Sequence, residues 1–452
     1  MLRRYARRSD APAAHDAEIH RIADLLLRLG DVLVSSGAAT SDVEAAVIAA
    51  ANAFGVPRTE VDISFSAVTV TLIRDDGPPV TQVRVVRHRS ANYARVAMVH
   101  NLVVDLVDND LSRREAAVRL GEIESLKPYY PRWMVSAGWG MLAASATNVL
   151  GGSLVIAIVA FASTVIVDQL GRFLRRHGWP DFYLQFVGGL VVGLIAAGLT
   201  ALNTDFRPSL VVAGGIIVLL AGLGIVSTLQ DALTGFLVTA AARIMEVVLM
   251  TGGIIGGVVF ALLIVEQWDI TMHVAPPTAA TTVAEVPVRT IAAGIGAASF
   301  ALAYQTPRRL LAPCAAIGGL SFIVWYAMQE SAGAAPLSAA VAAVVVGLAG
   351  HIVALRLHAP PLVVVVPGMV ILLPGLTIYR ALLELNAGFT AAGLFALIEA
   401  TAIGIALAAG VLVGEITAQP VRRELNRAER RFMRPRMVGP TRLEVKRRQR
   451  GW

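Results

Sequence analysis

The sequence is almost without cysteine, and between residues 133 and 414 it is poor in charge. Its only cysteine, Cys314, excludes a disulfide within the chain, and its apolar surroundings argue against thiol chemistry. Charged residues make up 16% of the 452 residues and hydrophobic residues 56%, with a mean hydropathy of +0.66. A water-soluble protein of this length is less apolar, so the composition predicts a polytopic α-helical membrane protein.

The first twenty residues lack the run of about 7–15 apolar residues that a secretory signal needs. We therefore expect residues 1–15 to be a disordered basic N-terminus and residues 16–128 to form a cytoplasmic α+β domain, called the head below. The net charge of +7 comes with no motif that reads nucleic acid, and arginines that flank membrane helices produce the same charge. No nucleic-acid partner is expected.

The head begins with two helix patterns. Apolar residues recur at three- and four-residue steps over 19–33, which predicts an amphipathic helix that ends at Gly37. Ser41 and Glu44 have the spacing of a capping box at the start of a second helix, and Gly55 follows its end. Two more helices are expected, over 91–108 and 112–125, the latter with a capping box at Ser112 and Glu115.

Between these helix pairs lies a strand pattern. The apolar alternation over 61–72 slips by one position after Phe65, which predicts one strand with a bulge, and a turn leads on to a second strand at 80–88. The histidines and carboxylates of the head have no metal-ligand or nucleophile–base spacing, so no catalytic residue, metal or cofactor is expected. A regulatory or gating role is favoured for the head. The open alternative is a membrane-anchored sensor or enzyme that acts through it.

Ten apolar runs have the length of a membrane-spanning helix, about 17–25 residues. They lie at 133–150, 152–168, 182–202, 209–228, 243–265, 288–304, 310–329, 336–355, 362–380 and 392–414. An even number puts both termini on one side, and the tail from residue 415 carries twelve arginines and lysines against four glutamates. Positive segments stay inside, so we predict a multi-pass protein of the cytoplasmic (inner) membrane with both termini cytoplasmic.

The short loops favour the same orientation. Those on the cytoplasmic side hold Arg172, Arg175, Arg176, Arg243, Arg308, Arg309 and Arg356, and those on the other side hold Arg207, Arg289 and Arg380. The long loop at 266–287, which is expected outside, has no arginine or lysine. This bias supports the topology independently of the tail.

The chain contains an internal repeat. A shift of 153 residues lays 210–225 over 363–378 without a gap, and eight of the sixteen positions are identical. The same shift carries Pro208 onto Pro361, Glu246 onto Glu399 and Gly257 onto Gly410. The repeat unit then has five helices, and an odd number inverts the second copy. We predict two inverted five-helix halves, at 129–265 and 288–414, with an extracytoplasmic loop at 266–287 between them and a basic cytoplasmic tail at 415–452.

The repeated segment carries residues that break helices, including two Pro-Gly pairs in its second copy. Inverted repeats with broken helices at matching positions are typical of secondary transporters, which bind substrate near the midplane through freed backbone groups. The predicted substrate-binding residues are Gly215, Gly222, Pro367, Gly368, Pro374, Gly375, Thr377 and Tyr379. The alternative is that these glycines and prolines only let helices pack or bend.

Two glutamates lie inside predicted spans, Glu246 and Glu399. A carboxylate in hydrocarbon costs about 2.5 kcal/mol or more, and burial shifts its pKa toward neutrality, as a proton-coupling group requires. The alternatives are an ion pair of Glu246 with Arg243 and a hydrogen bond between helices for Glu399. Further polar candidates that would support the site are Gln230, Asp231, Thr234, Arg243 and His351.

Three stretches together resemble the threonine/serine exporter family: LGDVLVSSGAATSDVEAAVIAAANAFGV, STLQDALTGFLVTAAARIMEVVLMTGGIIGGV and VPGMVILLPGLTIYRALLEL. The resemblance covers about residues 20–415, and this chain is similar to a fused form of the two-component exporters. It implies export of threonine and serine, driven by the proton gradient. The family pattern includes Gln230, Asp231, Thr234, Gly235, Arg243 and Glu246, and in the second half Pro367, Gly368, Pro374, Gly375, Thr377 and Tyr379.

The resemblance leaves the substrate open between two classes. Split relatives are associated with C4-dicarboxylate efflux, so a succinate-like substrate is the alternative. The expected partners are the small-molecule substrate, protons and the lipid bilayer, with further copies of the chain as an open alternative. The first repeat departs from the second because it has Gly214 and Ala221 where the second has Pro367 and Pro374.

Overall fold

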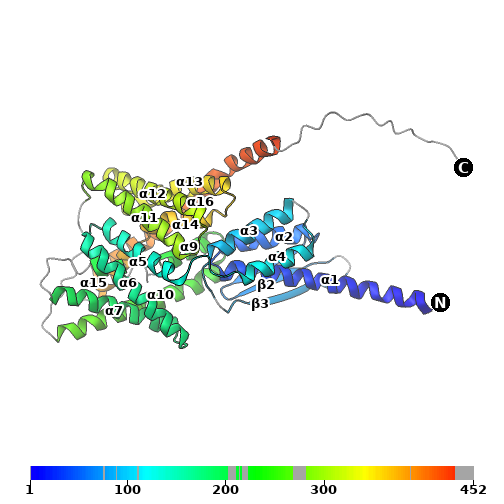
Figure 1. Cartoon of the computed structure of the whole chain (residues 1–452), viewed down its shortest axis with the longest axis horizontal. Coiled ribbons are helices and arrows are strands. Elements are labelled where there is room, and N and C mark those ends of the chain that lie inside the picture. Colours follow the sequence, from blue (N-terminus) through cyan, green and yellow to red (C-terminus); the bar gives the residue numbers. More distant parts are fainter. Residues whose placement is uncertain are drawn as a thin grey trace.

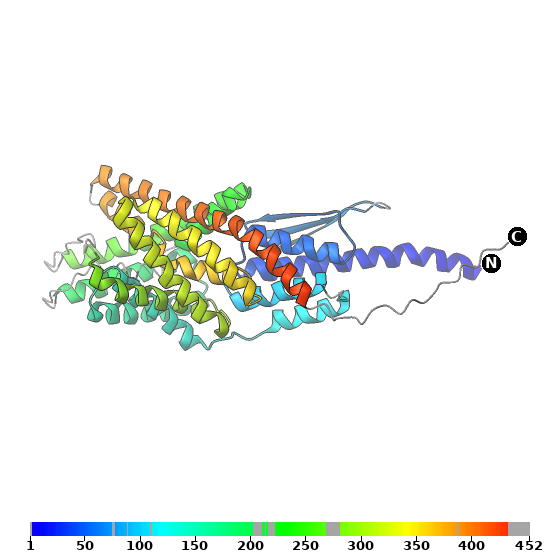
Figure 2. The same ribbon diagram turned by 90° about the horizontal axis from the view of Figure 1, so that it is seen from above.

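The computed structural model of the chain describes residues 2–74, 77–87, 89–108, 111–201, 210–212, 214–215, 222–267, 281–386 and 388–432. Most of these residues are helical, and the three strands of the described part all lie in the head. The head sits at one end of a bundle of long helices, residues 129–414, which we call the core (Figures 1 and 2). The helices of the core run roughly along the long axis of the molecule (Figure 2).

The head contains four helices and one antiparallel sheet. The helices are α1 (Leu2–Ser35), α2 (Thr40–Ala53), α3 (Tyr93–Asp108) and α4 (Arg113–Ser125). Helix α1 begins at Leu2, so residues 2–15 are helical where disorder was expected. The alanines and arginines of this segment are strong helix formers, and they extend the amphipathic helix at its start.

The sheet differs from the expected bulged strand. Strands β1 (Thr59–Ser64) and β2 (Ala67–Leu72) form a hairpin, and β3 (Val80–Val85) pairs with β2 on its other side. Ile63 pairs with Val68, so the slip in the apolar alternation is a tight turn at residues 65–66 and not a bulge. The hairpin lets β2 and β3 pack against α1, while β1 packs against α2.

The helix ends of the head follow the predicted signals in three places out of four. Gly37 and Gly55 have positive φ after α1 and α2, as a glycine at a helix C-terminus does. Ser112 and Glu115 form the predicted capping box of α4. The capping box at Ser41 is wrong, because α2 already begins at Thr40 and its N-cap residue is Ala39.

The core consists of helices joined mostly by short turns. They are α5 (Arg132–Val149), α6 (Leu154–Arg176), α7 (Asp181–Ala201), α9 (Gly222–Leu233), α10 (Leu237–Glu266), α11 (Val286–Ala303), α12 (Leu311–Ala332), α13 (Ala335–Arg356), α14 (Leu362–Met369), α15 (Gly375–Asn386) and α16 (Thr390–Phe432). Short 3₁₀ turns η1 (Val283–Glu285) and η2 (Arg308–Leu310) precede α11 and α12. Part of the expected tail is helical, since α16 continues to Phe432.

Seven helices of the described residues are long and apolar enough to cross a membrane: α6, α7, α10, α11, α12, α13 and α16. This agrees with a polytopic membrane protein, whereas ten spans are not confirmed. Of the other three expected spans, the first is the less apolar helix α5, the fourth falls mostly outside the described residues, and the ninth is broken.

The most extensive helix contacts of the core are those of α13 with α16 and of α7 with α10. Glycines make both contacts close. A Cβ on Gly257 of α10 would lie 1.9 Å from the Phe186 carbonyl oxygen of α7, and one on Gly410 of α16 would lie 2.6 Å from that of Ala340 of α13. Backbones approach this closely only where no side chain intervenes, as in other membrane helix pairs.

Candidate functional site

The predicted Pro-Gly segment forms one interruption of the helix where two were expected. Helix α14 runs through Pro367 and Gly368 to Met369, a 3₁₀ turn η3 (Val370–Leu372) follows, and α15 starts at Gly375. Only the second Pro-Gly pair interrupts the backbone, because Leu373 before Pro374 is extended, with φ −62° and ψ 136°. A residue before proline is pushed out of the helical region in this way.

The first Pro-Gly pair stays helical because another helix supplies the hydrogen bond that Pro367 cannot donate. Proline has no N–H, so Pro367 leaves the Val363 carbonyl, four residues earlier, without its helical donor. The thiol of Cys314 on α12 donates to this carbonyl, with Sγ 3.6 Å from the oxygen. Gly368 is needed for contact, since a Cβ there would lie 2.5 Å from Ile317 Cγ2. These contacts agree with the packing alternative for this pair, and a role of Pro367 and Gly368 in substrate binding stays a prediction.

The interruption at residues 370–374 lies against the centre of the core. Ile371 contacts α11 and α5 where they meet: a Cβ on Gly296 would lie 2.9 Å from Ile371 Cδ1 and 3.2 Å from Ser145 Cβ. Gly375 is buried at the first turn of α15, and Thr377 is half-buried. The first N–H groups of a helix have no partner within it, so this turn can offer donors to a negatively charged group. The side chain of Tyr379 lies outside the described part.

The sequence reasoning missed several buried hydroxyl groups of the core. Ser145, Thr147, Thr164 and Ser299 are all buried in α5, α6 and α11. Thr147 and Ser163 donate to carbonyls of their own helices, whereas Thr164 Oγ1 is buried without a hydrogen-bond partner. Their only sequence signal is a polar residue inside an apolar run, and serine and threonine are common enough in membrane helices to hide it.

The first copy of the repeat can be compared only in part. Gly215 is buried against α7, and a Cβ on it would lie 2.9 Å from Val192 Cγ1. Gly222 is the first residue of α9. Residues 213 and 216–221, which hold most of the predicted break, lie outside the described residues.

The polar candidates of α9 and α10 lie apart from the Pro-Gly segment, where the head meets the core. Helix α9 ends with Gly235 at φ +97°, and the Thr234 hydroxyl donates to the Gln230 carbonyl at 2.9 Å, so Thr234 closes the helix end. Asp231 Oδ2 lies 3.3 Å from Arg243 Nε, and their side chains are 3% and 18% exposed. Arg243 thus pairs with Asp231 across the α9–α10 turn, and not with Glu246.

Several head residues reach this pair. Thr40, in the first turn of α2, hydrogen-bonds with Asp231, and Thr239 of α10 donates to the Ile63 carbonyl at 2.8 Å. Arg89 lies over the Phe65 ring. The surrounding protein lowers the pKa of Arg89, as does Arg243 opposite it, although the side chain still reaches solvent.

His351 belongs to the same contact region. Its Nε2 lies 3.8 Å from Glu415 Oε1, and Asp42 of α2 interacts electrostatically with both. We call this region, where α2 and the loop before α3 meet α9, α10, α13 and α16, the junction. Its residues are Thr40, Asp42, Arg89, Asp231, Arg243, His351 and Glu415.

The two predicted proton-coupling residues belong to neither group. The side chains of Glu246 and Glu399 are exposed on the outer faces of α10 and α16, among exposed apolar residues such as Met245 and Ile398. Glu246 contributes to the electrostatics of Arg89. Among the described residues, no contact joins either carboxylate to the interruption before α15.

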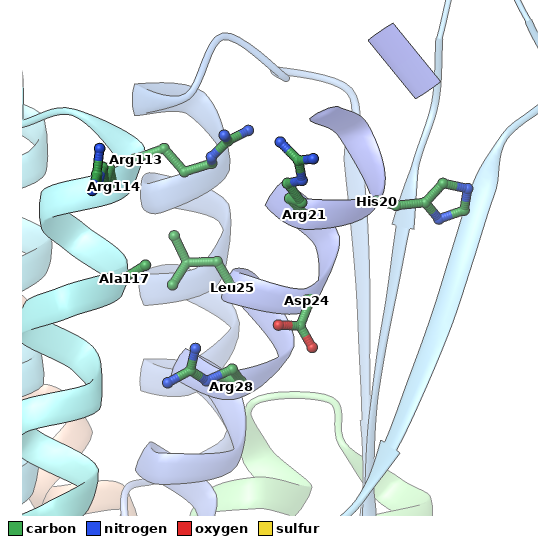
Figure 3. A pocket seen from close by; sticks show the side chains of 8 residues that line it. All are labelled: His20, Arg21, Asp24, Leu25, Arg28, Arg113, Arg114 and Ala117. Atoms are coloured by element: carbon green, nitrogen blue, oxygen red, sulfur yellow. The ribbon is translucent and has the colours of Figure 1, made fainter. Parts of the chain in front are cut away.

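A basic groove lies on the head, between α1 and α4 (Figure 3). It is lined by His20, Arg21, Asp24, Leu25, Arg28, Arg113, Arg114 and Ala117. Arg28 is held by Glu124, with Nη2 2.6 Å from Oε2, and Arg113 pairs with Glu18. These ion pairs neutralise much of the positive charge of the groove. Among the described residues, no cluster of three or more histidines, cysteines or carboxylates could hold a metal ion.

Comparisons with known proteins cover both the head and the core. The sequence pattern of the family described as "Putative threonine/serine exporter" matches residues 24–265. That of the family described as "Threonine/Serine exporter, ThrE" matches residues 289–417. No solved structure matches the chain.

Three curated relatives fall into two groups. The "Probable threonine/serine exporter" of Mycobacterium tuberculosis is 32% identical over 414 residues, which are 90% of this chain and 78% of that protein. The "Threonine/serine exporter" of Corynebacterium glutamicum is 32% identical over 416 residues, 90% of this chain and 84% of that protein. The "Probable succinate transporter subunit YjjP" of Escherichia coli is 27% identical over 244 residues, 53% of this chain and 93% of that protein. The chain therefore belongs to the threonine/serine exporter family, which is a family of transporters and not of enzymes.

Proposed function

We propose that this chain exports small amino acids, threonine and serine, from the cytoplasm, driven by the proton gradient. The observation that carries the proposal is the similarity, over 90% of the chain, to two proteins described as threonine/serine exporters. The helix interruption before α15 supports a substrate site in the core, because transporters bind substrates where helices break at mid-membrane.

The chemistry around the interruption suits a small hydroxylated amino acid. The Gly375 N–H already donates to the Leu373 carbonyl at 2.8 Å, but the rest of the first turn of α15, which includes Thr377, offers N–H donors and the positive end of a helix to the substrate carboxylate. Buried hydroxyls of Ser145 and Ser299 lie in the neighbouring helices for the substrate's own hydroxyl and ammonium groups. Binding would therefore use backbone and neutral side chains.

Two inverted halves are part of the proposal. Under the shift of 153 residues, α7 corresponds to α13 and α10 to α16, and the contacts of α7 with α10 and of α13 with α16 are the most extensive among the described helices. Likewise α5 with α6 corresponds to α11 with α12, and both pairs are in extensive contact. Corresponding helices thus make corresponding contacts in the two halves. This supports the repeat that the identity between 210–225 and 363–378 indicated.

The proposed orientation places the head, the tail and the junction in the cytoplasm, with the chain in the inner membrane. The head contacts the core at Tyr304, at the α9–α10 turn, and near His351 and Glu415. All of these lie at span ends that the loop charges place inside. The two described arginines expected outside, Arg289 and Arg380, each pair with a glutamate four residues away.

For proton coupling, Glu246 and Glu399 stay the candidates from the repeat. Their exposure on outer faces requires that each be protonated in lipid or covered by water or by a further copy of the chain. Replacing both by glutamine and finding unchanged gradient-driven efflux from loaded proteoliposomes would remove them from the proposal.

The second candidate, export of a C4-dicarboxylate, is favoured by the similarity of about half of the chain to a protein described as a probable succinate transporter subunit. A dicarboxylate needs free cations. The arginines beside the two repeated segments, Arg243 and Arg380, already face Asp231 and Glu384 at 3.3 and 2.7 Å.

One transport experiment separates the two substrate classes. Proteoliposomes loaded with unlabelled serine should take up labelled serine and threonine by exchange, and excess succinate should not compete. Exchange of succinate without exchange of serine would reverse the assignment.

A further inference from the structure

The groove between α1 and α4 of the head has room for a small molecule. Its volume is about 520 Å³, and ligand pockets usually measure about 300–1,000 Å³. The groove exists because α4 presents small residues to α1: Ala117 lines it, and a Cβ on Gly121 would lie 3.8 Å from Arg28 Nη2. Leu25 of α1 points toward Ala117 across the groove, which gives it an apolar wall (Figure 3).

Two arginines of this groove have no partner in the described part of the chain. Arg113 is paired with Glu18, whereas Arg21 of α1 and Arg114 of α4 form no ion pair or hydrogen bond with a described residue. Figure 3 shows the Arg113 side chain reaching from α4 toward Arg21, so like charges face each other at this end of the groove. An anion placed between guanidinium groups replaces their repulsion with attraction.

The other polar residues of the groove have partners on the sheet. The His20 ring points toward the strands, and its Nδ1 lies 3.1 Å from Gln82 Nε2 of β3 (Figure 3). Asp24 Oδ1 lies 4.0 Å from Arg84 Nη1, also of β3. At the end of the groove that holds the three arginines, the carboxylate of Glu18 therefore faces three positive charges. This end keeps a net positive charge.

The arginine end of the groove lies away from the core. The C-terminal end of α1 is near the core, because the Ser90 N–H donates to the Ser35 carbonyl and the nearby Tyr93 N–H donates to the Tyr304 carbonyl, both at 2.8 Å. Arg21 precedes Ser35 by fourteen residues, which is about 21 Å along the helix axis. The headgroup layer of a bilayer is only about 5–7 Å deep on each side, so a dissolved molecule reaches these arginines and a lipid headgroup does not.

We infer that this groove binds a small dissolved molecule that carries phosphate, with the phosphate at Arg21, Arg113 and Arg114. The three guanidinium groups come from two helices, and a tetrahedral phosphate presents oxygens in several directions, whereas one guanidinium fork already matches a planar carboxylate. The apolar wall of Leu25 and Ala117 accommodates an uncharged part of the molecule. The site belongs to the head and is separate from the interruption before α15, so the inference does not depend on the proposed transport function.

The first test measures binding of inorganic pyrophosphate to the purified full chain by isothermal titration calorimetry at constant ionic strength. We expect saturable binding, and an affinity about tenfold lower or more in the double variant Arg21→Gln with Arg114→Gln, because charge-assisted hydrogen bonds are lost. The matched control is Arg87→Gln, an exposed arginine outside the groove, which should keep the wild-type affinity. The absence of saturable binding to the wild type, an unchanged affinity in the double variant, or equally tight binding of succinate would overturn the inference.

The second test keeps the charges and removes the space. Ala117→Trp fills the groove, so pyrophosphate binding should be lost, and a wild-type affinity in this variant would overturn the groove as the site. The thermal midpoint of the arginine double variant gives a readout even if Ala117→Trp does not fold. Without pyrophosphate it should be no lower than that of the wild type, because repulsion is relieved; a clearly lower midpoint would mean that the arginines stabilise the fold and would overturn the inference. A chain that binds pyrophosphate but exchanges no serine would contradict only the proposed function.

Discussion

The interruption before α15 and the junction differ in almost every chemical respect. The interruption contains Pro374 and Gly375, its polar groups are backbone N–H and C=O, and the neighbouring helices α5 and α11 carry buried hydroxyls. The junction carries Asp42, Asp231, Arg243, His351 and Glu415 at the edge of the core. The difference teaches that backbone groups freed by a break can stay uncharged in the core, whereas charged side chains are placed at its edge, where each can find a partner.

The largest effect is expected from filling the glycine contact beside the interruption. A leucine in Gly368→Leu would meet Ile317 and Val346, whose atoms lie 2.5 and 3.2 Å from the Cβ position. We expect loss of most folded protein, measured by size-exclusion chromatography after solubilisation. Gly252→Leu on α10, where nothing lies within 4 Å, is the matched control and should fold normally.

The next effect belongs to the junction. Asp231→Asn leaves Arg243, 18% exposed, without its carboxylate, and breaking a buried pair costs about 3 kcal/mol. We expect a clear fall in the thermal midpoint of the solubilised protein. Adding Arg243→Gln should recover part of this loss. If the double variant is as unstable as the sum of the two single ones, the pair does not hold the junction.

A smaller, functional effect is expected from Pro374→Ala. Alanine lets the helix continue through the extended residue Leu373, which would close the gap before α15. Serine exchange should fall about tenfold, which corresponds to about 1.4 kcal/mol, while the amount of folded protein stays the same. Pro367→Ala, inside the continuous α14, should keep exchange near the wild-type rate. Equal losses in both variants would contradict the role of the interruption.

The smallest effect tests the contact that keeps α14 helical. Cys314→Ala removes the donor to the Val363 carbonyl and should lower stability by about 1 kcal/mol, read from the thermal midpoint. Cys314→Ser keeps a donor of similar size and should lose less. If serine and alanine are equally destabilising, the hydrogen bond to Val363 is not what matters.

Local signals in the sequence were sufficient for much of the fold. Gly37 and Gly55 correctly indicated where α1 and α2 end, and Ser112 where α4 begins. Helix caps and positive φ angles depend on neighbouring residues, which is why the sequence shows them. The strand turn at 65–66 was misread, since an alternation that changes phase fits both a bulge and a tight hairpin.

The rest depended on contacts distant in sequence. Pro367 stays helical because Cys314, on another helix, bonds the carbonyl it frees. Thr40 lies nearly two hundred residues from Asp231, so nothing in its own neighbourhood indicated their hydrogen bond. The sequence suggested an ion pair between Arg243 and Glu246, which lie one helical turn apart. The turn at Gly235 instead brings Asp231 to Arg243.

Helix α16 is one uninterrupted rod from Thr390 to Phe432. At 1.5 Å per residue its 43 residues are about 64 Å long, so the helix extends well past its apolar span and over the head (Figure 2). It can act as a lever: a tilt of about 10° at its buried start would carry its far end sideways by about 11 Å. A small adjustment of its apolar span would thereby become a large displacement of its far end beside the head, which a label on the distal turn could report.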